Sequence, residues 1–205
     1  MGRNGTHKAI TMHSYSYDTD NKQTILFWIA GISLLLVYLF ATILIILKIQ
    51  LWWFVQIPSA LAVYLILVKR LEESLWKNAY IRRILGITIP DISGEYYGSA
   101  KTIKGEGGKE VRVRLFISQD WTRMVIRLEA ENSVSKSNVA SLLTDDGFPV
   151  LNYQYENKPK VDAKDGMHVH KGYAQIEFKD RNANGEYFTG RDRETYGKLD
   201  LVKDK

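Results

Sequence analysis

The sequence contains no cysteine, which excludes disulfide bonds, thiol catalysis and metal sites built on cysteine. A chain without disulfides is compatible with a reducing cytosol. The sequence also lacks any nucleophile, acid–base pair or phosphate-binding loop at a recognised spacing. We therefore predict that the protein is not an enzyme and that it carries no cofactor and no metal.

Two stretches resemble parts of metal sites. DRNANGE, residues 180–186, matches the start of a calcium loop, but Arg191 stands at the twelfth position, where a bidentate glutamate is needed. This stretch predicts a hairpin turn instead. His168 and His170 would share one face of a strand, but no third ligand lies on a predictable face nearby.

Two long apolar runs lie near the N-terminus, Ile25–Leu47 and Leu51–Val68, separated only by Lys48, Ile49 and Gln50. A helix needs about 20 apolar residues to cross a bilayer. The first run is too long and too uniformly apolar for an amphipathic core helix. We therefore predict a transmembrane helical hairpin over 24–70, with helices at 24–47 and 51–69, because backbone groups in lipid need internal partners.

Basic residues flank both outer ends of this predicted hairpin, whereas the connecting turn has only Lys48. By the positive-inside rule, both termini are then expected in the cytoplasm, including an N-terminal tail over 1–23. The formal charge of +5 and the pI near 9.2 indicate anionic partners, a membrane surface among them. The flanking basic residues are Arg3, Lys8, Lys22, Lys69, Arg70, Lys77, Arg82 and Arg83.

Residues 71–90 are predicted to form an amphipathic linker whose short helix stops at Gly86. Beyond it the apolar residues alternate with a period of two, which is typical of strands separated by tight turns. Turns are predicted at 105–109, 145–147, 165–166 and 182–185. The predicted strands are Ile92–Lys104, Glu110–Gln119, Met124–Ala130, Asn138–Thr144, Val150–Glu156, His168–Lys179, Glu186–Thr189 and Tyr196–Lys203.

About eight antiparallel strands over residues 91–205 predict a small barrel or a sandwich. We favour a lipocalin-like, up-and-down barrel in the cytoplasm, because closure removes exposed edges. The interior of such a barrel is filled by side chains or holds one small ligand. The predicted fold class is thus a membrane protein: a two-helix transmembrane hairpin followed by an eight-stranded antiparallel barrel.

Alternation predicts which side chains point into this barrel. Val113, Leu115 and Ile117 share one face of their strand, while Arg112 and Arg114 share the other. The same rule places Met124, Ile126, Leu128, Ala174, Ile176 and Phe178 inside, and Arg123, Arg127, Lys171, Gln175 and Glu177 outside.

Two segments are candidates for ligand contact. In TGRDRETYG, residues 189–197, the side chains of Arg191, Arg193 and Thr195 share one strand face, with Tyr196 beside them. Arginine forks bind phosphate and tyrosine rings stack on bases, although a solvated turn explains the same residues. In ISGEYYGSA, residues 92–100, Tyr96 and Tyr97 contact a ligand or fill the barrel floor.

A helical hairpin followed by a barrel of this size resembles the membrane effectors of cyclic-oligonucleotide-based antiphage signalling (CBASS), specifically the SMODS-associating two-transmembrane, β-strand-rich family. The resemblance runs from residues 25–68 to the final GKLDLVK and includes the glycine–tyrosine first strand and the arginine–tyrosine last hairpin. It implies that the barrel binds a cyclic dinucleotide made by a CD-NTase synthase. It further implies that the chain then oligomerises and disrupts the bacterial inner membrane, so that the infected cell dies.

The resemblance also implies a multi-pass inner-membrane protein that binds no DNA or RNA. Two alternatives remain open from the residues alone. One is a membrane-tethered barrel that binds a lipid or another apolar ligand, which requires an enclosed apolar cavity and no role for Arg191 or Arg193. The other is a structural subunit whose filled barrel docks a protein partner.

Overall fold

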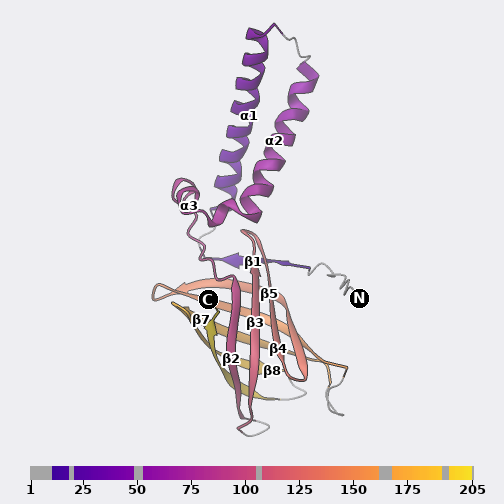
Figure 1. The fold of residues 1–205 in the computed structure, drawn as a ribbon, viewed down its shortest axis with the longest axis vertical. Coiled ribbons are helices and arrows are strands. Elements are labelled where there is room, and N and C mark those ends of the chain that lie inside the picture. The colour runs from indigo at the N-terminus through magenta and orange to yellow at the C-terminus, as the bar shows by residue number, and fades with distance from the viewer. Residues whose placement is uncertain are drawn as a thin grey trace, which may run out of the picture. The chain divides into compact units, whose positions relative to one another are not determined.

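The computed structural model describes residues 11–18, 21–48, 53–104, 108–161, 168–190 and 194–204 (Figure 1). The chain divides into two compact units. One unit is helical and comprises residues 19–89. The other contains the strands and combines the segment up to residue 18 with residues 90–205.

The helical unit contains α1 (Lys22–Ile46), α2 (Trp53–Glu73), the short 3-10 helix η1 (Leu75–Lys77) and α3 (Ala79–Leu85). Helices α1 and α2 pack against each other. Large apolar side chains nevertheless remain exposed along α1, among them Phe27, Leu35 and Phe40. Gly86 ends α3 in the left-handed conformation, with φ of 64°, so the predicted stop is confirmed.

The predicted two-helix transmembrane hairpin is wrong. Among the described residues, one helix is long and apolar enough to cross a membrane, and it is α1. Helix α2 does not end with its apolar run but continues through Lys69, Arg70, Glu72 and Glu73. The prediction considered only the apolar run and not the charged residues at the C-terminal end of the helix. It therefore overestimated how apolar α2 is over its whole length.

The second unit contains nine strands, and they form a closed barrel in the order β1-β4-β3-β2-β9-β8-β7-β6-β5. Figure 1 shows β2, β3 and β4 side by side on one wall. The strands are β1 (His13–Tyr17), β2 (Gly94–Lys104), β3 (Glu110–Gln119), β4 (Arg123–Ala130), β5 (Ser133–Asp145), β6 (Phe148–Pro159), β7 (His170–Lys179), β8 (Asn182–Thr189) and β9 (Tyr196–Lys203).

The predicted eight-stranded, up-and-down order is therefore wrong as well. The strand that was missed is β1, which comes from the segment predicted as a tail. It lies between β4 and β5, antiparallel to β4 and parallel to β5. Strands β4 and β5 pair directly only over three residue pairs, between Arg127–Glu129 and Val134–Lys136.

One predicted turn is misplaced. Residues 182–185 belong to β8, and the β7–β8 hairpin turns instead at Asp180 and Arg181. Asp180 adopts the left-handed conformation, with φ of 56°, which a two-residue hairpin turn requires. The inward positions, by contrast, are confirmed. Val113, Leu115, Ile117, Met124, Ile126, Ala174, Ile176 and Phe178 are all buried.

A buried polar network closes one end of the barrel. The side chain of Gln119 accepts a hydrogen bond from the backbone N–H of Ile92 (3.0 Å) and donates to the Tyr15 hydroxyl (3.1 Å) and the Pro90 carbonyl (3.0 Å). The Tyr15 hydroxyl in turn donates to the Trp121 carbonyl (3.0 Å), and burial raises the pKa of Tyr15 to about 12. This network ties β1 into the barrel.

Glycines occupy inward positions on four neighbouring strands: Gly98 on β2, Gly172 on β7, Gly185 on β8 and Gly197 on β9. At Gly98 an added Cβ would collide with the carbonyl oxygen of Asp200 and lie 2.9 Å from the Cα of Leu201. The obstacle is the backbone of β9, which cannot rotate away as a side chain can. Gly98 therefore permits the close approach of β2 and β9.

We expect Gly98→Ala to destabilise the protein by about 1–3 kcal/mol or more, as overpacking against fixed backbone does. The measurement is a urea or thermal unfolding curve of the full chain. Gly190→Ala is the matched control, because its Cβ would meet only the Lys171 carbonyl oxygen, at 3.2 Å. Equal stabilities of the two variants would contradict the close-approach role of Gly98.

Candidate functional site

The barrel contains a cavity of about 380 Å³ at the end opposite the Gln119 network. The described segments around it are the ends of the β2–β3, β4–β5, β6–β7 and β8–β9 hairpins. Its lining comprises Ala100, Thr102, Lys109, Val111, Val113, Leu128, Ala130, Glu131, Asn132, Ser133, Ser135, Tyr153, Tyr155, Asn157, His170, Ala174, Tyr187, Thr189, Thr195 and Leu199.

Two of the inward glycines leave room for tyrosine side chains in this cavity. A Cβ at Gly172 would collide with the ring of Tyr155, and a Cβ at Gly197 would lie 2.5 Å from the hydroxyl of Tyr187. Tyr155 on β6 and Tyr187 on β8 each lie on the strand next to that of the glycine, and both line the cavity. Glycine at these positions therefore lets large aromatic rings lie flat against the wall rather than fill the interior.

Hydroxyl groups pair with one another at the open end. The Thr102 hydroxyl of β2 lies 2.9 Å from the Tyr187 hydroxyl of β8, across β9, and the Thr189 hydroxyl lies 2.7 Å from that of Thr195. Thr189 also accepts a hydrogen bond from the backbone N–H of Thr195, at 2.9 Å. The described ends of β8 and β9 are therefore held together where they border the cavity.

A second polar pair lies deeper, on β5 and β6. Ser135 donates to the side-chain carbonyl of Asn157 at 2.9 Å, and both residues are buried. Burial also raises the pKa of Tyr153, which keeps its hydroxyl protonated and able to donate. Lys109 and His170 are the basic residues of the described lining, and Glu131 is its acidic residue. The cavity thus offers aromatic faces, hydrogen-bond donors and few charges.

The predicted site residues divide into those at the cavity and those elsewhere. Thr195 lines the cavity. Tyr196, its neighbour, lies outside the lining and stacks on Phe188, with ring centroids 5.5 Å apart. Arg191 and Arg193 lie outside the described residues. They follow Gly190 directly in a hairpin whose described flanks, Thr189 and Thr195, both line the cavity.

The two tyrosines predicted on the first barrel strand do not line the cavity. Tyr96 is buried in the core, where its hydroxyl donates to the Ile92 carbonyl (2.8 Å) and its ring packs edge-on against Phe178. Tyr97 faces outward, donates to the Glu95 carboxylate (2.7 Å) and lies under the guanidinium of Arg114. The structure thus gives Tyr96 a packing role and places Tyr97 on the outer wall.

Sequence reasoning missed several polar residues of the cavity, chiefly Thr102, Asn157, Tyr187 and Thr189. The alternation of side chains along the strands could have found two of them. Thr102 and Tyr187 occupy inward-facing positions, where an apolar residue is usual. His170, considered earlier for its spacing from His168, is buried, whereas His168 is exposed. Among the described residues, no group of three or more potential ligands comes together to hold a metal ion.

Comparisons with known proteins place this unit among related sequences. The sequence model of the family described as "Cap15, cyclic dinucleotide receptor domain" matches residues 87–203. A CD-NTase-associated protein 15 from Yersinia aleksiciae is 32% identical over 148 residues, covering 71% of this chain and 69% of the relative. A protein of the same name from Staphylococcus schleiferi is 26% identical over 168 residues, covering 80% and 90%. The range 87–203 contains every residue that lines the cavity.

Proposed function

The chain belongs to the Cap15 cyclic dinucleotide receptor domain family, and on that premise we propose that the cavity is where this CBASS effector binds its cyclic dinucleotide. The observation that carries the proposal is the coincidence of the matched range with a polar, aromatic-lined cavity in the barrel. Its volume of about 380 Å³ falls within the range of small-molecule sites in proteins. The ligand would come from a CD-NTase synthase.

The described lining fits the parts of such a ligand. Bases have flat faces and polar edges, and the rings of Tyr155 and Tyr187 together with the amide of Asn157 offer stacking and hydrogen bonding. Phosphates prefer hydroxyl, ammonium and guanidinium donors. At the open end, Thr189 and Thr195 supply hydroxyl groups and Lys109 supplies an ammonium group. We propose that Arg191 and Arg193 supply the guanidinium groups.

The cavity is unsuited to the alternative of a lipid or another apolar ligand. Most of its lining residues carry a polar atom, including hydroxyls from threonine, serine and tyrosine and the amides of Asn132 and Asn157. An alkyl chain bound there would lie against these polar groups without forming a hydrogen bond to any of them, whereas a polar ligand can form such bonds. This lining therefore favours a polar ligand.

We further propose that α1 attaches the effector to the bacterial inner membrane. Ligand binding would drive oligomerisation of the barrels, and the gathered α1 helices would then disrupt the bilayer and kill the infected cell. The support is the length and apolar composition of α1. A ligand shifts an assembly equilibrium only by its differential affinity for the two states, so the oligomer must bind the cyclic dinucleotide more tightly than the unassembled chain does.

Filling the cavity should abolish binding. Ala100 lines the cavity and its neighbour Lys101 faces outward, so Ala100→Phe places a ring in the ligand volume and Lys101→Phe places the same ring outside. We expect calorimetry with cyclic dinucleotides to show loss of binding for Ala100→Phe and parental affinity for Lys101→Phe, with matched thermal melts. Parental binding by a folded Ala100→Phe variant would show that the ligand site lies elsewhere.

The two arginines of the β8–β9 hairpin should contribute to affinity. Removing one charged hydrogen bond costs about 1.5–3 kcal/mol, so Arg191→Ala or Arg193→Ala should weaken binding roughly ten- to a hundredfold. Lysine at either position should restore binding only in part, because it lacks the planar guanidinium group that donates two parallel hydrogen bonds to a phosphate. Arg112→Ala removes an outward-facing arginine of β3 and serves as the control. Unchanged affinity in both hairpin variants would refute their role.

The membrane step should depend on the apolar surface of α1. Leu35 and Leu39 are exposed on this helix, and each arginine placed at the centre of a span costs about 2.5–3.5 kcal/mol on insertion scales. We expect Leu35→Arg with Leu39→Arg to abolish cell killing in phage-infected cultures while leaving cyclic dinucleotide affinity unchanged. The control replaces both leucines with isoleucine. Killing by the double arginine variant at parental levels would contradict a membrane role for α1.

A further inference from the structure

Three polar side chains form a row across the inner wall of the barrel. In the strand register, Ser135 on β5 pairs with Asn157 on β6, and Asn157 pairs with His170 on β7. All three residues are buried, and all three line the cavity. A buried polar group is costly unless it forms a hydrogen bond. The partner of each group in this row therefore bears on what the cavity can bind.

The amide of Asn157 is held in one orientation, with its nitrogen left for a ligand. Its side-chain oxygen accepts a hydrogen bond from the Ser135 hydroxyl at 2.9 Å. Its nitrogen, which carries two N–H donors and no acceptor, has no hydrogen-bond partner among the described residues. Asn157 is only 6% exposed and lines the cavity, so a partner for this nitrogen must come from within the cavity.

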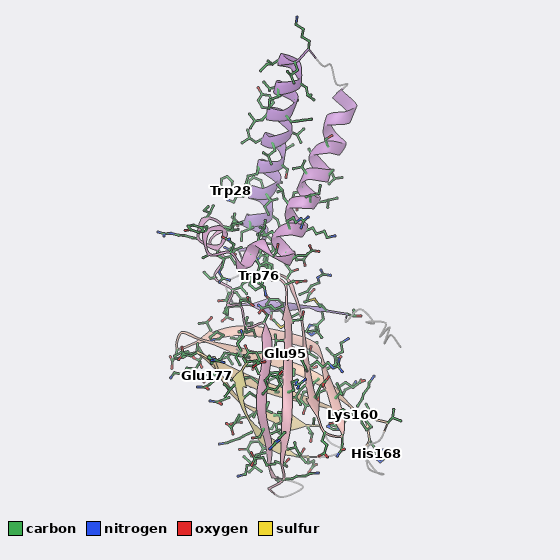
Figure 2. All side chains as sticks on the ribbon, viewed as in Figure 1. Trp28, Trp76, Glu95, Lys160, His168 and Glu177 are labelled. Atoms are coloured by element: carbon green, nitrogen blue, oxygen red, sulfur yellow. The ribbon has the colours of Figure 1, made fainter. Side chains whose placement is uncertain are left out.

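The backbone carbonyls near this row are engaged. The ammonium group of Lys160 donates to the carbonyls of Ala130 (2.7 Å) and Glu131 (3.0 Å). The ring of His170 donates from Nδ1 to the carbonyl of His168, at 3.2 Å. Figure 2 shows Lys160 and His168 at the same end of the barrel. The carboxylate of Glu131 belongs to an exposed residue at the rim. The buried part of the described lining thus offers the amide donor without a carboxylate beside it.

The tyrosine hydroxyls of the lining do not discriminate between donors and acceptors on a ligand. Those of Tyr155 and Tyr187 are bonded within the protein. The hydroxyl of Tyr153 has no hydrogen-bond partner among the described residues, although this residue is 3% exposed. Because a hydroxyl rotates to donate or to accept, Tyr153 suits any base edge. An amide held by Ser135 presents only donors, so Asn157 is the group that discriminates.

We propose that Asn157 selects the base of the cyclic dinucleotide, favouring a base with a carbonyl oxygen over a base with an amino group. Guanine and uracil carry a carbonyl oxygen at the position where adenine and cytosine carry an amino group. The Asn157 N–H donates to that oxygen, whereas an amino group would face it donor against donor. Ser135 is a positioning residue, because its hydrogen bond fixes which end of the amide faces the ligand. This inference rests on the proposed function of the cavity.

Matched ligands measure this preference. Cyclic di-IMP and cyclic di-AMP carry purines of the same size, which differ in a carbonyl or an amino group at C6 and in the proton at N1. Cyclic di-UMP and cyclic di-CMP differ in the same way at C4 and N3. Calorimetry with the full chain gives the ratio of affinities within each pair. We expect about a tenfold preference for the carbonyl ligand, because it gains one hydrogen bond that the amino ligand cannot form.

Three variants assign the preference to the amide. Asn157→Asp replaces the N–H donors with an acceptor, and its added charge weakens both ligands of a pair alike. We therefore expect the ratio to reverse, to about tenfold in favour of the amino ligand. Asn152→Asp makes the same change at an outward position of β6, where Asn152 accepts from the Tyr173 hydroxyl, and should keep the parental ratio. Ser135→Ala frees the amide to turn either end to the ligand, so the ratio should approach one.

Thermal melts show which variants fold, and the smaller change, Ser135→Ala, keeps the test valid should the buried carboxylate of Asn157→Asp prevent folding. If none of the four ligands binds, or if binding survives in Ala100→Phe, the cavity is not the site and both proposals fall. If Ala100→Phe abolishes binding but the parent shows no carbonyl preference, the cavity function stands and selection by Asn157 is overturned. A parental ratio in folded Asn157→Asp or Ser135→Ala would overturn it equally.

Discussion

The hollow end of the barrel depends on backbone contacts that only glycine permits. Four neighbouring strands, β7, β8, β9 and β2, each place a glycine inward, where a Cβ would meet the backbone or a tyrosine ring. A barrel of this size is either filled by its own side chains or able to hold one small ligand. At the opposite end the interior is filled, and Gln119 satisfies the polar groups that converge there. The same wall is therefore packed at one end and able to hold a ligand at the other.

Much of the strand pattern was predictable because alternation is local. Strands β3 and β9 begin and end where the sequence predicts, and the inward residues are confirmed. Strand β1 was missed for a physical reason. Three of its five residues pair with β5, more than 120 positions away, and the other two pair with β4, more than 100 positions away. No local pattern encodes such partners. The same limit applies to Gly185, which lies in a turn-like sequence but serves a close approach to Gln175 and Ile176 within the sheet.

The candidate site was only partly predictable, because parity shows that a side chain points inward but not at which end of the barrel it lies. Tyr96 and Thr195 both point inward, but Tyr96 lies in the filled core and Thr195 in the cavity. Cross-strand register decides between these outcomes. In the helical unit, α1 and α2 both contain a long apolar run, and the sequence pattern did not show that α2 continues beyond its run into the charged segment Lys69–Glu73.

The β8–β9 hairpin connects the cavity with the outer wall. Thr189 and Thr195 line the cavity, while their chain neighbours Phe188 and Tyr196 stack on each other outside the lining. Adjacent strand residues point to opposite faces and share a peptide unit. A ligand that moved the backbone at Thr195 would therefore also move Tyr196 on the outer side. The proposed ligand-driven assembly would require such coupling, since a ligand enclosed by the barrel changes a neighbour's binding only through the surface it alters.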